Sequence, residues 1–178
     1  MLKVLLFRTP GIEDLLLYSC IDVLSTVFDD VVVEIAAMEI DIPKHLYDSR
    51  RRQYHADGVV YFVSKFLEKN AYGILLANVD GYVPGLNFVF GLAIPSLKCA
   101  VVFTERLKIQ TDFRNYVYRI QKEVVHEFGH LLGLDHCTTS SCVMRFSNTV
   151  FEVDAKGVNF CRRCRAKLLK NGIRVREL

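Results

Sequence analysis

One eleven-residue run constrains the fold of this chain more than any other feature of its sequence. Starting at His126, it reads His-Glu-Phe-Gly-His-Leu-Leu-Gly-Leu-Asp-His. Its first seven residues are the end of a segment, residues 111–132, that we predict to be a long helix. His126 and His130 are four positions apart, so they stack on one helix face and can bind one ion. Gly133 favours the left-handed conformation that ends a helix. The chain can therefore turn there and bring His136 back as a third nitrogen ligand.

Three histidine ligands leave one position of a tetrahedral zinc ion open, which is the arrangement of catalytic rather than structural sites. Glu127 is rotated by about 100° from His126 around the helix, so it lies beside the ion and can accept a proton from a zinc-bound water. Zinc would lower the pKa of that water and polarise the scissile carbonyl. The pattern predicts a metal-dependent hydrolase with Glu127 as general base. The alternatives are core or surface histidines without a metal, and a Glu127 that is only a solvated carboxylate beside an inert ion.

Four of the six cysteines follow the third histidine closely in the sequence. They form two close pairs separated by a loop: Cys137 and Cys142, then Cys161 and Cys164. This spacing is typical of a tetrahedral four-thiolate zinc site, which has no open position and is structural. Such a site would attach the C-terminal segment to the end of the long helix and would fix the backbone beside His136. Two disulfides or a redox-active C-x-x-C pair are the alternatives.

The basic residues of the chain gather around the second cysteine pair. Residues 161–178 contain seven lysines and arginines against one glutamate, whereas the whole chain has a net charge of only +3. Four thiolates around one Zn²⁺ leave a net negative charge, so nearby cations would lower the pKa of the thiols. We therefore interpret the basic tail as a counter-charge to the metal site. A zinc-ribbon-like nucleic-acid binder is the alternative, but no aromatic stacking pattern accompanies the charges.

The order of predicted strands and helices indicates an α/β fold. Apolar or β-branched runs predict strands over residues 3–7, 31–36, 73–79, 86–93 and 99–103. Helical patterns cover residues 13–28, 59–69 with Asp57 as a cap, 111–132 and 164–170. Two βα crossovers imply a mixed, mostly parallel sheet, and the closely spaced later strands allow one antiparallel edge strand. Residues 41–53 are polar and are expected to be a loop.

The length of the chain indicates how many domains it forms, and its hydropathy indicates the cellular compartment. A chain of 178 residues corresponds to one domain, and we expect a monomer. The first apolar run ends at Arg8 and is too short for a signal peptide. The most apolar later stretch, residues 88–97, is far shorter than a membrane-spanning helix. The sequence therefore predicts a soluble cytoplasmic protein without a membrane partner.

Taken together, these motifs resemble those of the metzincin metallopeptidases. The match is the H-E-x-x-H-x-x-G-x-x-H motif of residues 126–136 followed by Met144. The cysteine after the third histidine continues as C-x4-C-x-M and ends in C-x-x-C, an arrangement similar to that of the archaemetzincins. The strong motifs cover residues 126–164. Softer matches, which extend the resemblance over most of the chain, are residues 79–82, 86–93 and 145–148.

The resemblance implies a zinc peptidase that acts on peptide or protein substrates and holds one catalytic and one structural Zn²⁺. It also implies a single catalytic domain over residues 1–178, with a sheet-bearing part (1–133) and a zinc-stapled part (134–178) on either side of a cleft. Met144 would form a hydrophobic floor under the catalytic zinc. Phe146 stands where some metzincins place a tyrosine, so the sequence identifies no oxyanion donor besides zinc. An antiparallel edge strand would align the substrate through its backbone, and the candidates are Phe90, Gly91, Leu92 and Ala93.

A second function, of another class, fits the same motifs. It is a zinc-stabilised binding module that binds nucleic acid through the basic tail and has little or no peptidase activity; salt-sensitive binding would favour it. Glu127 discriminates between the two functions, because a binding module has no need of a carboxylate at that position. The sequence therefore favours the enzyme, with a peptide rather than a nucleic acid as its partner.

Overall fold

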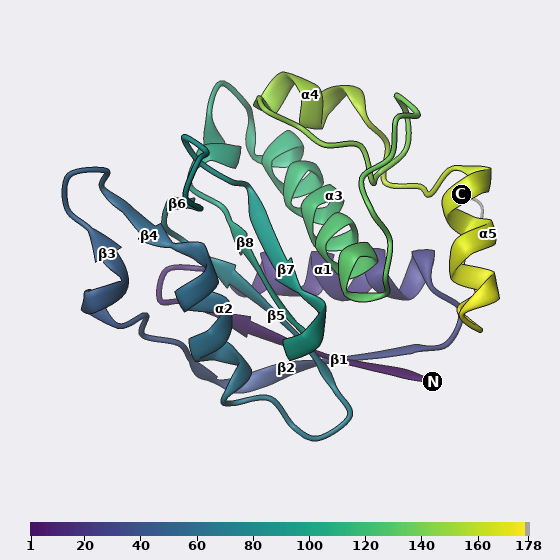
Figure 1. The fold of residues 1–178 in the computed structure, drawn as a ribbon, viewed down its shortest axis with the longest axis horizontal. Helices are drawn as coiled ribbons and strands as arrows, with labels where there is room; N and C mark the ends of the chain where they lie inside the picture. Colours follow the sequence, from purple (N-terminus) through teal and green to yellow (C-terminus); the bar gives the residue numbers. More distant parts are fainter. Residues whose placement is uncertain (177–178) are drawn as a thin grey trace.

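A computed structural model gives the fold of the chain and describes residues 1–176. These residues form a five-stranded sheet, a small three-stranded sheet and five α-helices (Figure 1). The strands are β1 (Leu2–Arg8), β2 (Val31–Glu39), β3 (Tyr47–Asp48), β4 (Gln53–His55), β5 (Tyr72–Ala77), β6 (Gly81–Tyr82), β7 (Gly91–Ile94) and β8 (Cys99–Phe103). The α-helices are α1 (Asp14–Val27), α2 (Ala56–Ser64), α3 (Phe113–Leu131), α4 (Val150–Ala155) and α5 (Arg162–Lys170).

The five-stranded sheet has the order β2-β1-β5-β8-β7. β1 pairs in parallel with β2 and β5, and β5 pairs in parallel with β8. β7 runs antiparallel to β8 at the edge of the sheet, with Leu92 opposite Val101. The predicted α/β class, with a mixed sheet and one antiparallel edge strand, is confirmed.

The sheet separates two hydrophobic cores. Val4 and Leu6 of β1 pack into the core formed with α1 and α3, whereas Leu5 and Phe7 pack into the core formed with α2. Successive side chains of a strand point to opposite faces, so one strand contributes to both cores and its sequence is apolar throughout. Figure 1 shows α1 and α3 on one side of the sheet and α2 on the other, with α4 and α5 beyond α3.

α3 is the longest helix, and local signals set both of its ends. The side chain of Asp112 caps its start by accepting a hydrogen bond of 2.8 Å from the backbone N–H of Asn115. Gly133, with φ of +90°, follows its end, and its N–H donates to the carbonyl of His130 (2.9 Å). α3 packs against β7 and β8. Its C-terminal turns therefore lie beside the antiparallel edge of the sheet.

The strand predicted over residues 86–93 is wrong in its first half. Regular pairing begins only at Gly91. The carbonyls of Leu86 and Asn87 instead accept hydrogen bonds from the side chain of Arg51 (2.8 and 3.0 Å), so they are not available to a neighbouring strand. Val89 retains a single bridge to Gly81.

Three other segments differ from the sequence predictions. Residues 41–53 include a 3₁₀ turn (Lys44–Leu46) and β3 rather than only a loop. α2 begins at Ala56, so Asp57 lies in its first turn and does not cap it. α4 was not predicted. Within residues 1–176, no helix combines the length and apolar character that crossing a membrane requires.

Candidate active site

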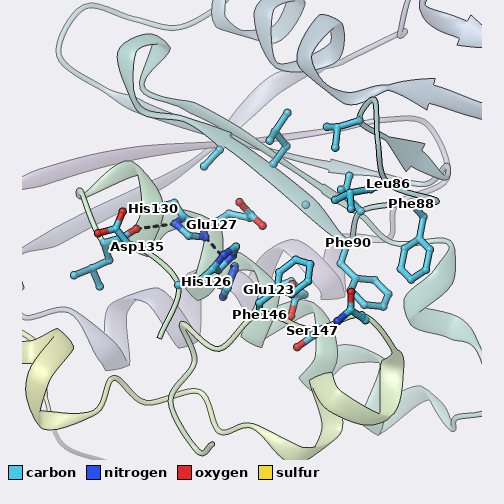
Figure 2. A pocket seen from close by; sticks show the side chains of 18 of the residues that line it. Leu86, Phe88, Phe90, Glu123, His126, Glu127, His130, Asp135, Phe146 and Ser147 are labelled. Atoms are coloured by element: carbon cyan, nitrogen blue, oxygen red, sulfur yellow. Dashed lines mark hydrogen bonds between the residues drawn. The ribbon is translucent and has the colours of Figure 1, made fainter. Parts of the chain in front are cut away.

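A cleft of about 660 Å³ lies between the C-terminal turns of α3, the edge strand β7 and the irregular residues that precede β7. The three histidines and Glu127 of the sequence motif all line it. Figure 2 shows His126, Glu127 and His130 on one side of the cleft, with Phe88 and Phe90 on the other. The fold therefore brings the predicted polar residues together opposite an aromatic wall.

The three histidines form a compact set of nitrogen donors. One ring nitrogen from each of His126, His130 and His136 lies within 4.8 Å of the others. The Nε2 atoms of His126 and His130 are 3.1 Å apart, close to the ~3.3 Å expected between two ligands of one tetrahedral zinc. The Nδ1 atom of His126 lies 2.8 Å from the carbonyl of Val143, and that of His130 lies 2.7 Å from the carbonyl of Leu134. Hydrogen bonds from Nδ1–H to carbonyls direct Nε2 toward a metal.

The protonation state of these histidines suits a metal. Burial lowers the pKa of His126 well below its usual value, and the positive charge of Lys156 lowers it further. Burial is also the main cause that lowers the pKa of His130 and of His136. Neutral imidazole is the form that binds zinc, so the donor set fits the ion that the sequence predicts.

The carboxylate of Glu127 is buried between α3 and β7. Burial raises its pKa well above the usual value, the charge of Glu123 raises it further, and Lys156 opposes the rise. A Cβ atom on Gly91 would lie 2.5 Å from Oε1 of Glu127, so the carboxylate packs directly against the backbone of β7. A raised pKa makes a carboxylate a stronger proton acceptor near neutral pH.

Two charged residues behind the histidines are not among the site residues predicted from the sequence. Oε1 of Glu123 lies 2.9 Å from Nζ of Lys156, and both side chains are buried. Nζ of Lys156 also donates to the carbonyl of Arg145 (3.2 Å) and lies 3.5 Å from Nδ1 of His126. Glu123 is one helical turn before Glu127, so helical spacing could have drawn attention to it. No local signal marks Lys156.

Two more buried charges of α3 hold α4 in place. The guanidinium of Arg119 donates to both carboxylate oxygens of Asp154 (2.8 and 2.7 Å). Nζ of Lys122 donates to the carbonyls of Val153 (2.9 Å) and Asp154 (3.1 Å), at the end of α4. These contacts anchor the C-terminal part of the chain against the helix that carries the histidines.

Met144 lies directly against this helix. Its side chain is fully buried, and a Cβ atom on Gly129 would lie 2.4 Å from its sulfur. Its carbonyl accepts a hydrogen bond of 2.9 Å from the N–H of Cys137. The ring of Phe146, two residues later, lies 4.9 Å from the ring of His136. The position that carries a tyrosine in some metzincins therefore contacts a predicted ligand without offering a hydroxyl.

The four clustered cysteines also come together. Their sulfur atoms lie within 4.8 Å of one another, and the Cys137–Cys161 and Cys142–Cys164 pairs are each separated by 3.7 Å. A disulfide requires ~2.0 Å between sulfurs, so neither pair is bonded. Ligands 2.3 Å from one tetrahedral zinc are ~3.8 Å apart. The sulfur positions therefore fit a zinc ion and do not fit the disulfide alternative.

Hydrogen bonds lower the pKa of the Cys137 thiol. Burial raises its pKa, but hydrogen bonds from Thr139 and Arg163 outweigh this effect and bring the pKa to about 6. The Arg163 contact measures 3.4 Å from Nη2 to the sulfur. Arg163 belongs to the basic tail, so at least one cation of the tail acts on the cysteine cluster as predicted.

The mixed sheet, the long helix along the cleft, and the histidine and cysteine clusters define the class of this protein as a zinc metallopeptidase. Residues 1–170 match peptidase family M54. Archaemetzincin from Pyrobaculum aerophilum is 48% identical over 132 residues, which are 74% of this chain and 81% of that protein. Archaemetzincin from Saccharolobus islandicus is 40% identical over 162 residues, covering 80% of this chain and 86% of that protein. The chain therefore belongs to peptidase family M54.

Solved structures agree with this assignment. The crystal structure of archaemetzincin from Methanopyrus kandleri superposes with a TM-score of 0.87 at 35% identity, covering 96% of this chain and 94% of that one. The malonate complex of archaemetzincin from Archaeoglobus fulgidus gives a TM-score of 0.81 at 34% identity, covering 93% of this chain and 99% of that one.

Proposed function

We propose that this peptidase cleaves peptide bonds with Glu127 as general base and with His126, His130 and His136 as ligands of a catalytic Zn²⁺. The observation that carries the proposal is the meeting of three imidazoles of lowered pKa with a buried carboxylate of raised pKa in one cleft. Bound zinc would supply a Lewis acid that activates water and polarises the scissile carbonyl. Gly133 supports this site by ending the helix after His130.

Glu127 moves the proton in the proposed reaction. Its carboxylate accepts a proton from the attacking water and then donates it to the leaving amine. Burial and the nearby charge of Glu123 both raise its pKa, which favours holding the proton between the two steps. Its close packing against Gly91 restricts where the carboxylate can lie.

The edge strand aligns the substrate in this proposal. Residues 90–93 line the cleft, and β7 has its paired neighbour, β8, on one side only within the described sheet. Backbone groups on the other side can therefore pair with an extended peptide. The same positions, Phe90, Gly91, Leu92 and Ala93, are the ones predicted from the sequence.

A second, structural Zn²⁺ completes the proposal. Cys137, Cys142, Cys161 and Cys164 would hold it and would join the start of α5 to residues 137–142, which follow His136, with Met144 packed below the histidine site. Elemental analysis of fully loaded protein should give two zinc ions per chain, one for each cluster. A single zinc together with six titratable thiols would remove the cysteine site.

The decisive test of the catalytic assignment is Glu127→Ala. The variant should retain both zinc ions but lose cleavage of a diverse peptide library by about 10²- to 10⁴-fold, the usual contribution of a general base. Glu13→Ala is the matched control, because Glu13 is an exposed glutamate at the start of α1. Undiminished cleavage by Glu127→Ala would contradict the assignment.

A further inference from the structure

The side of the cleft opposite the histidines is built from residues 83–90, which we call the cleft wall. All of these residues except Pro84 line the cleft, and the rings of Phe88 and Phe90 pack edge to face at 5.1 Å. The wall lies outside the regular strands, and Gly85 has φ of +90°. Its backbone bonds include those from Leu86 N–H to Val83 (3.1 Å) and from Val89 N–H to Gly81 (2.9 Å). Such a segment depends on side chains elsewhere to hold its position.

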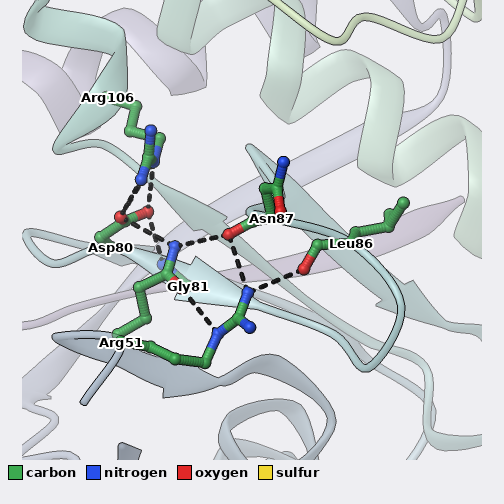
Figure 3. A network of polar contacts seen from close by, with 7 residues as sticks. Arg51, Asp80, Gly81, Leu86, Asn87 and Arg106 are labelled. Atoms are coloured by element: carbon green, nitrogen blue, oxygen red, sulfur yellow. Dashed lines mark hydrogen bonds and ion pairs between the residues drawn. The ribbon is translucent and has the colours of Figure 1, made fainter. Parts of the chain in front are cut away.

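Arg51 supplies the most direct of these contacts. It lies between β3 and β4, far from the wall in the sequence, and its Nη2 atom donates to the carbonyls of Leu86 (2.8 Å) and Asn87 (3.0 Å). Its Nε atom donates to Oε1 of Gln53 (3.0 Å). Its guanidinium also lies 4.2 Å from the centre of the Tyr82 ring. Figure 3 shows the side chain reaching across to the two carbonyls.

Three other side chains extend this network. Nε2 of Gln53 donates to the carbonyl of Asn87 and to Oδ2 of Asp80, both at 3.0 Å. Asp80 is paired in turn with the guanidinium of Arg106 (2.8 Å from Nη2 to Oδ2). That guanidinium lies 4.3 Å from the centre of the Phe88 ring. The network therefore reaches both the backbone and an aromatic side chain of the cleft wall.

We propose that Arg51 is a positioning residue of this peptidase, which holds the cleft wall at the separation from β7 and α3 that an extended peptide requires. A guanidinium can bind two successive carbonyls and Gln53 at once, whereas a lysine ammonium offers no planar fork of donors. Arg51 belongs to neither hydrophobic core. Its loss should therefore loosen the wall without unfolding the protein.

The experiment compares Arg51→Ala with Arg50→Ala. Arg50 is the exposed neighbour of Arg51, and its side chain makes no hydrogen bond or ion pair among residues 1–176. For a peptide identified from the library, Arg51→Ala should raise KM about tenfold and change kcat by less than about threefold, since binding rather than chemistry is affected. Arg51→Lys should give an intermediate KM. Zinc content should stay at the wild-type level.

Hydrogen–deuterium exchange gives a second readout that does not require activity. Amides of residues 83–90 should exchange at least about tenfold faster in Arg51→Ala, while those of α3 keep their wild-type rates. Asp80→Asn, which weakens the Arg106 contact, should act in the same direction. Unchanged exchange of the wall relative to Arg50→Ala, or faster exchange that includes α3, overturns the proposal.

The KM comparison rests on the proposed function, but the exchange comparison does not. If the wild-type enzyme cleaves no peptide, the proposed function fails, and wall exchange still decides the role of Arg51. If peptides are cleaved and Arg51→Ala has the KM of Arg50→Ala, the role of Arg51 fails and the proposed function stands.

Discussion

The buried ion pair between Lys156 and Glu123 allows a quantitative prediction. Lys156→Met removes an ammonium group of 0% exposure that lies 2.9 Å from Oε1 of Glu123. It leaves that carboxylate buried without a cation and the carbonyl of Arg145 without its donor. Breaking a buried pair from one side costs about 3–5 kcal/mol, a large part of a total stability of about 5–15 kcal/mol. At about 2–4 °C per kcal/mol for a chain of this size, Tm should fall by about 6–20 °C.

Thermal and urea unfolding of single and double variants would measure this effect. Glu123→Gln combined with Lys156→Met removes both charges, and it should recover at least about half of the loss, since no uncompensated charge remains. Lys167→Met is the control: Lys167 is 53% exposed and lies 3.7 Å from the exposed carboxylate of Asp135, so its loss should cost less than about 1 kcal/mol.

Two results would refute the reasoning about this pair. One is a loss of less than about 1 kcal/mol in Lys156→Met, which would mean that the site relaxes or admits water without cost. The other is a double variant whose loss equals the sum of the two single losses, which would show that the two charges do not act together.

Two further predictions concern the surroundings of the site. Gly91→Ala would place a Cβ atom 2.5 Å from Oε1 of Glu127, so the carboxylate must move. We expect kcat/KM to fall by about 10²-fold while the zinc content stays unchanged. A kcat/KM within about twofold of the wild-type value would contradict the contact. Asp154→Asn removes the negative charge and one of the two oxygens that accept hydrogen bonds from the buried Arg119. Those bonds lower the pKa of Asp154, and weakening them should cost about 1 kcal/mol of unfolding free energy at neutral pH, because the Asp154 side chain is 43% exposed. That stabilisation needs the ionised carboxylate, so it is complete above the unfolded pKa of about 3.9 and is lost as the pH falls through the lower folded pKa. In urea unfolding, the gap between wild type and variant should therefore close as the pH falls from about 5 to about 2, and a gap independent of pH would contradict this.

The elements that the sequence predicts well are those with local signals. The capping side chain of Asp112 and the positive φ of Gly133 lie at the two ends of α3, and both residues are recognisable in the sequence. The mostly parallel character of the sheet follows from the alternation of strands and helices. The cleft wall could not be predicted, because Arg51, which binds the carbonyl of Leu86, is 35 positions away. α4 has only six residues, too few to show a helical period.

The residues of the candidate site also divide into those that the sequence predicts and those that it does not. The spacings of the histidines and of the cysteines along the chain already suggest two sets of common ligands, and the fold brings each set together. Lys156 has no such spacing relative to Glu123, 33 positions earlier in the chain. Lysine and glutamate are rarely buried. The residue types of Lys156 and Glu123 therefore argue against the buried ion pair that the two side chains form in the structure.

The adjacency of His136 and Cys137 limits how this part of the chain can change in length. One peptide bond joins a member of each cluster, and it holds their Cα atoms about 3.8 Å apart. An extra residue between them would displace either the His136 side chain from the histidine cluster or the Cys137 side chain from the cysteine cluster. Insertions and deletions near the two clusters must therefore fall outside this pair of residues.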